Sequence, residues 1–195
     1  MPQHVNDTSA SPNDLNDVDL QKKFQTVTDM AMIADRERAL GHRIVLCHGV
    51  FDLLHMGHVR HLTQAKSHGE RLIVTVTDDA FVNKGPGKPV FPGHLRAEML
   101  ASLSCVDWVA INHAPDAEPL LAAIKPDIYA KGADYADASS DITGKIQRER
   151  EMAERFGGEV IFTEDITFSS SELLNRHFDL FTPRVRDFLD RLRTD

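Results

Sequence analysis

Short apolar runs alternate with amphipathic helical patterns along most of the chain. Five runs dominated by apolar residues are typical of strands buried on both faces of a parallel sheet: Ile44–Cys47, Leu72–Val76, Trp108–Ile111, Ile128–Ala130 and Val160–Phe162. The intervening patterns predict helices over Val59–Ser67, Leu95–Leu103, Glu118–Ile124, Ile142–Phe156 and Ser170–Arg176. Repeated strand–helix units predict an α/β fold with a doubly wound parallel sheet in a single domain.

The two ends of the chain differ from this regular centre. Residues 1–15 are polar and rich in turn formers, which predicts a disordered segment, and residues 16–41 predict a helical lead-in. The α/β domain is expected over residues 42–178. Residues 179–195 predict a last helix, and the pattern leaves open whether it packs on the domain, packs on a second copy of the chain or acts as a linker.

The segment from His48 to His58 joins the first predicted strand to the helix that follows it. It reads His-Gly-Val-Phe-Asp-Leu-Leu-His-Met-Gly-His, so His55 and His58 lie at the start of that helix. The N-terminus of a helix presents unpaired N–H groups and a positive dipole end, which suits an anion. Histidines add donors that can carry charge near neutral pH. The turn is therefore predicted to hold a phosphate chain.

Two further places carry basic side chains in positions typical of ligand sites. The segment Lys84–Gly93 contains three glycines and three prolines, which predicts a loop, and it carries Lys84 and Lys88. Lys131 follows a predicted buried strand and precedes Gly132. Ligands of doubly wound sheets bind beyond the carboxyl ends of the strands, where the strand order reverses.

Composition restricts the partners of the chain. With 22 Lys and Arg against 30 Asp and Glu, the 195 residues carry a net charge of −8. This charge argues against broad binding of nucleic acid or of an anionic membrane surface. The N-terminus lacks an apolar signal core and no run reaches membrane-spanning length, so a cytoplasmic location is expected. The two cysteines do not form a Cys-x-x-Cys pair.

The run Gly49–His58 resembles the signature of the cytidylyltransferase-like nucleotidyltransferases. Further segments, in the same order, most closely resemble the adenylyltransferase domain of the bifunctional heptose-phosphate kinase/adenylyltransferase: Thr77–Ala80, Lys84–Pro89, Arg96–Glu98, Cys105–Asp107, Lys125–Asp127, Lys131–Tyr135 and Gly157–Val160. The resemblance covers roughly residues 24–177, which leaves no room for the kinase half. It implies a Rossmann-like sheet of the type that carries His-x-Gly-His.

The resemblance also implies an activity. An enzyme of this family transfers the nucleotidyl group of ATP or CTP to a phosphorylated sugar or polyol and releases pyrophosphate, with Mg²⁺ carried by the nucleotide. ATP is favoured, with a cytidylyltransferase of the glycerol-3-phosphate type as the alternative. A non-catalytic nucleotide-binding module is the alternative from another class. Neither nucleic acid nor a membrane is expected as a partner, and a homodimer is left open.

Site residues follow from the resemblance position by position. His55, His58, Lys84 and Lys131 are implied as catalytic groups. The implied nucleotide- and phosphate-binding residues are Gly49, Val50, Phe51, Gly57, Arg96, Gly132, Asp134, Ser169, Ser170 and Ser171. No protein metal site is expected, because no carboxylate or cysteine is placed to complete one with His55, His58 and His61.

Three positions have separate interpretations. Asp52 is interpreted as structural, fixing the turn through local backbone hydrogen bonds. His48 stands where heptose adenylyltransferases usually carry asparagine, and the sequence leaves open whether it contacts nucleotide or fills the strand end. The acidic segment 133–141 is longer than the loop expected there. Both departures suggest an acceptor other than a heptose phosphate.

Overall fold

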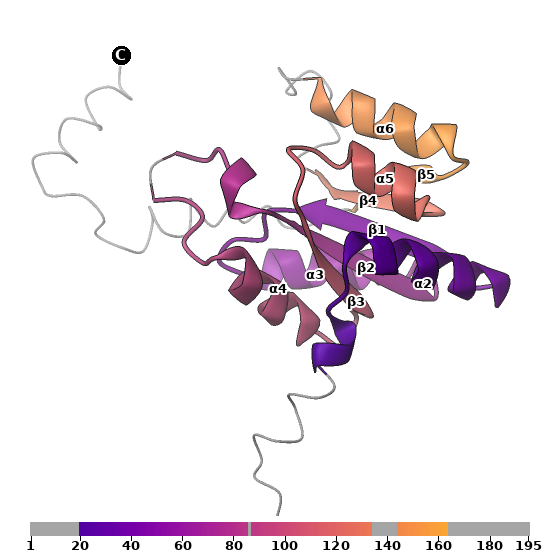
Figure 1. The fold of residues 1–195 in the computed structure, drawn as a ribbon, viewed down its shortest axis with the longest axis horizontal. Coiled ribbons are helices and arrows are strands. Elements are labelled where there is room, and N and C mark those ends of the chain that lie inside the picture. The colour runs from indigo at the N-terminus through magenta and orange to yellow at the C-terminus, as the bar shows by residue number, and fades with distance from the viewer. Residues whose placement is uncertain (1–19, 86, 134–143, 164–195) are drawn as a thin grey trace, which may run out of the picture.

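A parallel sheet forms the centre of the molecule in the computed structural model, which describes residues 20–85, 87–133 and 144–163 (Figure 1). Its strands are β1 (Ile44–Gly49), β2 (Arg71–Thr77), β3 (Trp108–Asn112), β4 (Ile128–Gly132) and β5 (Glu159–Thr163). The strand order is β3-β2-β1-β4-β5, and every neighbouring pair is parallel. The order therefore reverses between β1 and β4, where Cys47 pairs with Ala130.

Helices cover both faces of the sheet (Figure 1). They are α2 (Val27–Ala39), α3 (Met56–Lys66), α4 (Gly93–Ala101), α5 (Glu118–Ile124) and α6 (Lys145–Arg155), with the short 3₁₀ helix η1 (Asp79–Phe81). Among the described helices, none is both long and apolar enough to cross a membrane. The α/β fold with a doubly wound parallel sheet is confirmed.

Two separate apolar layers show which helices share a face. Leu62 of α3 and Leu100 of α4 pack with Val45 and Val74 of the sheet on one side. On the other side Leu46 and Ile73 pack with residues of α2, α5 and α6: Met30, Ala34, Leu120, Leu121, Ile124 and Ala153. Successive strand residues point to opposite faces, so the alternation of Val45, Leu46 and Cys47 between the layers follows from the pleat.

All five predicted strands are present, and each is one to two residues longer at one or both ends. The predicted helix Glu118–Ile124 has the observed bounds of α5, and the helices α3, α4 and α6 lie within three residues of their predicted limits. The helix α2 lies inside the predicted lead-in 16–41. The predictions for 1–15, 170–176 and 179–195 fall outside the described residues.

Candidate active site

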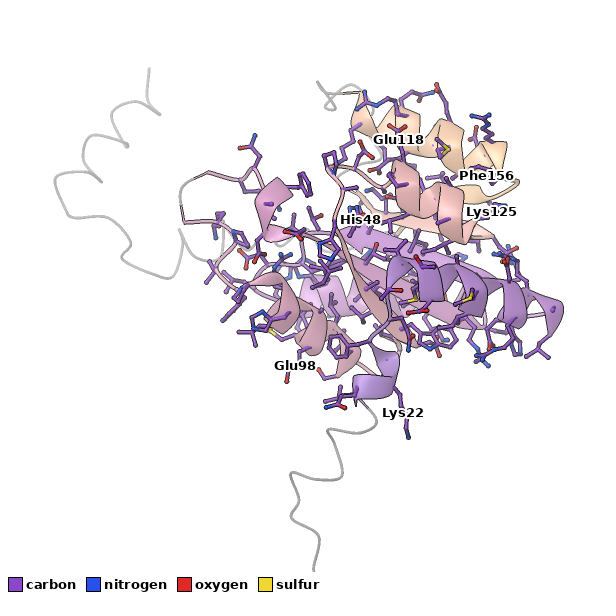
Figure 2. The ribbon with its side chains drawn as sticks, viewed as in Figure 1. Lys22, His48, Glu98, Glu118, Lys125 and Phe156 are labelled. Carbon is purple, nitrogen blue, oxygen red and sulfur yellow. The ribbon has the colours of Figure 1, made fainter. Side chains whose placement is uncertain are left out.

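The reversal of strand order places the ends of β1 and β4 side by side. Gly49 ends β1 and Gly132 ends β4, and a Cβ added at Gly132 would meet nothing within 4 Å. In Figure 2, His48 lies near the middle of the molecule, close to the end of β1. Parallel sheets bind ligands at such a crevice, so this edge is the candidate active site.

The turn from β1 to α3 is strained. Phe51 and Leu53 have φ angles of +50° and +51°, values that residues other than glycine rarely adopt. A Cβ at Gly49 would lie 3.2 Å from the ring of Phe51, which is close enough to disturb the turn. Such strain persists where the surrounding structure holds the backbone, and it is concentrated at functional sites.

The two histidines of the turn cap α3 reciprocally, and this defines their protonation. His55 Nδ1 accepts a hydrogen bond from the N–H of Gly57 at 3.1 Å, and His58 Nδ1 accepts one from the N–H of His55 at 3.4 Å. An accepting nitrogen carries no proton, so each neutral ring carries its proton on Nε2. Both rings thus have an Nε2–H donor at the N-terminus of the helix.

The rings of His55 and His58 lie against each other, with centroids 4.0 Å apart and planes inclined by 27°. The edge of Phe51 contacts His58, with ring centroids 5.5 Å apart. Burial first, and then the nearby charges of His55, His61 and Lys84, lower the pKa of His58 to about 4. The expected positive charge is therefore absent from His58 in the free protein, because burial disfavours the cation. Its donor group remains.

His48 is also kept neutral. Its ring is buried, with Nδ1 2.9 Å from the hydroxyl of Thr75 and Nε2 3.4 Å from the hydroxyl of Thr77. Burial first, and then the charge of Lys131, lower the pKa of His48 to about 3. The side chain thus fills the end of the strand in this structure, and its contact with nucleotide stays a prediction.

The stability of the protein is expected to fall between pH 6.5 and pH 5. An unfolded histidine has a pKa near 6.5, above the folded values of His48 and His58. In this range the unfolded state binds more protons, so acidification favours it by up to about 1.4 kcal/mol per pH unit for each ring. Urea unfolding at several pH values measures the slope. His48→Asn should flatten it, whereas replacing the exposed His68 with asparagine should not; equal slopes in both variants would contradict the assignment.

The glycine- and proline-rich loop lies beside this turn. Lys84 is exposed, and its charge acts on His58. Asp52 fixes the end of the loop, because its carboxylate accepts hydrogen bonds from the N–H groups of Val90 and Phe91 at 2.9 and 3.2 Å. Lys88 lies 3.8 Å from the same carboxylate. Asp52 is structural, as predicted, and these two backbone partners lie 38 and 39 residues away along the chain.

Arg96 is fully buried and contacts four separate segments. Its guanidinium donates to the carbonyl oxygens of Val50, Thr77 and Phe91 and to the carboxylate of Asp79. These bonds join the histidine turn, the end of β2, η1 and the end of the loop. Contact of Arg96 with phosphate stays a prediction, and in this structure its donors bind protein oxygens.

Lys131 lies at the end of β4, with its side chain only 7 % exposed. Its Nζ is 3.0 Å from Glu149 Oε2 and 3.1 Å from the hydroxyl of Tyr129. Glu149 comes from α6 and was missed by sequence reasoning. A carboxylate between Ile146 and Ala153, on the buried side of an amphipathic helix, was the signal that could have indicated it.

Some of the remaining predicted site residues lie in the described part of the chain and others lie outside it. Gly49, Val50, Phe51 and Gly57 belong to the turn or to the first turn of α3. Asp134, Ser169, Ser170 and Ser171 lie outside the described residues. Within residues 20–85, 87–133 and 144–163, no group of three or more His, Cys, Asp or Glu could hold a metal ion.

Comparison with known proteins gives the family. The model of the cytidylyltransferase-like family matches residues 46–176, which span the strained turn, the loop and α6. The chain belongs to the cytidylyltransferase-like family. The sequence resemblance to this family is thereby confirmed.

Two curated relatives are similar to a large part of the chain. The chain is 43% identical over 131 residues to the bifunctional protein HldE of Pseudomonas fluorescens (strain SBW25), covering 63% of this chain and 28% of that protein. It is 41% identical over 137 residues to the HldE protein of Hahella chejuensis, covering 69% and 27%. This cytidylyltransferase-like chain thus spans less than a third of the curated relatives it matches.

A solved structure shares the fold of this cytidylyltransferase-like chain. It is the lipopolysaccharide core biosynthesis protein of Thermoplasma volcanium GSS1, which is 25% identical with a TM-score of 0.54. The match covers 65% of this chain and all of that one. The likeness therefore agrees with the α/β fold described above.

Proposed function

We propose that the chain is a nucleotidyltransferase of the heptose adenylyltransferase type, which transfers the nucleotidyl group of ATP or CTP to a phosphorylated sugar or polyol. The observation that carries this proposal is the pair of stacked histidines, whose Nε2–H donors lie at a helix N-terminus at the reversal point of the sheet. ATP is favoured because the segments Lys84–Pro89 and Lys131–Tyr135 resemble those of heptose adenylyltransferases.

The chemistry is a displacement at phosphorus. An oxygen of the acceptor phosphate forms a bond to the α-phosphorus, the bond from that phosphorus to the bridging oxygen breaks, and pyrophosphate leaves with the electron pair. His55 and His58 donate hydrogen bonds to phosphoryl oxygens, whose charge increases in the transition state. Lys84 approaches the phosphates from the neighbouring loop. Lys131, at the end of β4, is the fourth proposed catalytic group.

The experiment is a matrix of nucleoside triphosphates against phosphorylated sugars and polyols, measured by pyrophosphate release. Release with ATP and a sugar phosphate supports the proposal, whereas release only with CTP and glycerol 3-phosphate supports the cytidylyltransferase alternative. Binding of nucleotide without pyrophosphate release, for every acceptor, would indicate a non-catalytic module.

Pyrophosphate release is expected to require a divalent cation. The described site presents N–H and ammonium donors, and no described cluster of ligands could hold a metal. A Mg²⁺ ion carried by the nucleotide would neutralise phosphate charge in this site. Excess chelator should abolish activity and added Mg²⁺ should restore it. Undiminished activity in chelator would contradict the requirement.

A further inference from the structure

A band of buried polar side chains crosses the sheet near its carboxyl edge. It comprises Asn112 of β3, Thr75 and Thr77 of β2, His48 of β1 and Lys131 of β4, which are each at most 8 % exposed. The strand register and the two-residue alternation place them on the face covered by α2, α5 and α6, beyond the apolar residues Leu46, Ile73, Ala110 and Tyr129. We call this set, together with Glu149, the polar band.

The helix α6 adds a carboxylate to the band. Glu149 is 1 % exposed, and its Oε2 accepts hydrogen bonds from the hydroxyl of Tyr129 at 2.8 Å and from Nζ of Lys131 at 3.0 Å. Burial raises the pKa of Glu149, but the charge and hydrogen bond of Lys131 and the bond from Tyr129 outweigh it, so the net shift is downward. The group is therefore an ionised acceptor.

The second oxygen of this carboxylate has no donor. Among the described residues, Glu149 Oε1 is the one buried side-chain nitrogen or oxygen without a hydrogen-bond partner. Buried polar groups are nearly always bonded, and an unsatisfied charged acceptor is costly. A hydroxyl or N–H donor from a ligand would remove this cost.

The charges of the band indicate which part of a ligand it suits. Lys131 and Glu149 form an ion pair, and His48 is neutral, so these three groups carry no net charge together. The turn at His55, in contrast, presents N–H donors at a helix N-terminus, which suits an anion. A neutral, hydroxylated group therefore fits the band better than a phosphate does.

We propose that the polar band binds the hydroxylated carbon chain of the acceptor, with Glu149 Oε1 accepting a hydrogen bond from one acceptor hydroxyl. This inference rests on the proposed function, which supplies an acceptor with both a phosphate and hydroxyls. The band lies at the carboxyl edge of the sheet, next to the reversal between β1 and β4, and Lys131 keeps a small exposure there, so we place the entry of the acceptor at this edge. Glu149 is then a specificity-determining residue, because acceptors without that hydroxyl leave its oxygen unpaired.

The test compares Glu149→Gln with a matched control on the same helix. Glu151→Gln makes the same substitution at an exposed position of α6. In E149Q the KM of the best acceptor from the matrix should rise at least tenfold, while the KM of the nucleotide changes less than twofold. E151Q should change neither. An unchanged acceptor KM, or an equal rise in both KM values, would overturn the inference.

Deoxy analogues locate the contact. In the wild-type protein one monodeoxy form of the acceptor should lose at least tenfold in kcat/KM, and in E149Q the same analogue should lose less than threefold further. If E149Q does not fold, Glu149→Asp keeps the charge that pairs with Lys131 and withdraws the carboxylate by one methylene. Loss of acceptor-induced thermal stabilisation in that variant would support the subsite, and retained stabilisation would overturn it.

The outcome separates this inference from the proposed function. Wild-type pyrophosphate release with unchanged acceptor KM in E149Q would retain the function and reject the subsite. Without pyrophosphate release, thermal stabilisation by glycerol 3-phosphate and by mannose 1-phosphate is the readout. Stabilisation of the wild type that is lost in E149Q would retain the subsite and reject the function, whereas no stabilisation by either probe would reject the subsite too.

Discussion

Replacing His58 with alanine is expected to lower turnover by at least two orders of magnitude. His58 Nδ1 accepts the N–H of His55, which leaves the proton on Nε2 as a fixed donor. Removal of one such donor to the transition state typically lowers turnover 100- to 1,000-fold. The loss should appear mainly in kcat, because the negative charge on the phosphoryl oxygens is greatest in the transition state.

The fold of the His58 variant should be retained. The substitution removes one long capping hydrogen bond of 3.4 Å, so the expected loss of unfolding free energy is about 1 kcal/mol. Pyrophosphate release and urea unfolding are measured on the same preparation. Replacing the exposed His68 with alanine, near the other end of α3, is the control and should leave both unchanged. A fully active His58→Ala protein would remove His58 from the mechanism.

Replacing Arg96 with methionine is expected to destabilise the protein by about 3 kcal/mol or more. Methionine fills much of the same buried volume but donates no hydrogen bond. The carbonyl oxygens of Val50, Thr77 and Phe91 would then lose a charged donor, and each buried acceptor left unsatisfied costs about 1–3 kcal/mol. The loss is measured by chemical unfolding.

Two comparisons define the role of Arg96. Arg60→Met makes the same substitution at an exposed position of α3 and should change stability by less than about 0.5 kcal/mol. Arg96→Lys keeps the charge without the planar fork of donors, so it should recover only part of the lost stability. Equal stabilities for R96M and R60M would show that the four contacts contribute nothing measurable.

The agreement between sequence and structure is best where the signal is local. The run Ile44–Cys47 and the helix over Glu118–Ile124 depend on apolar patterning within one segment, and both are present. Strand ends were less accurate, because His48 and Gly49 continue β1 through pairing with Thr75 and Val76 of β2. Such pairing has no signature in the polar residues themselves.

The site residues were also predicted best where their contacts are local in the sequence. His55 and His58 are three residues apart, so their joint position at the start of α3 followed from the motif. The long-range partners of Asp52 and Arg96 did not follow from any motif. Val90 lies 38 residues from Asp52 along the chain, and Val50 lies 46 residues from Arg96. Glu149 was absent from the predicted site because its link to Lys131 spans 18 residues and two elements.

The sequence by itself determined the order of strands and helices and the histidine turn at the start of α3, because hydrophobic periodicity and capping act over a few neighbouring residues. Only the tertiary structure decided that the sheet reverses between β1 and β4 and that burial keeps His48 and His58 neutral. It also decided that Glu149 neutralises Lys131. These properties depend on desolvation and on contacts between distant segments, and both arise only when the chain has packed.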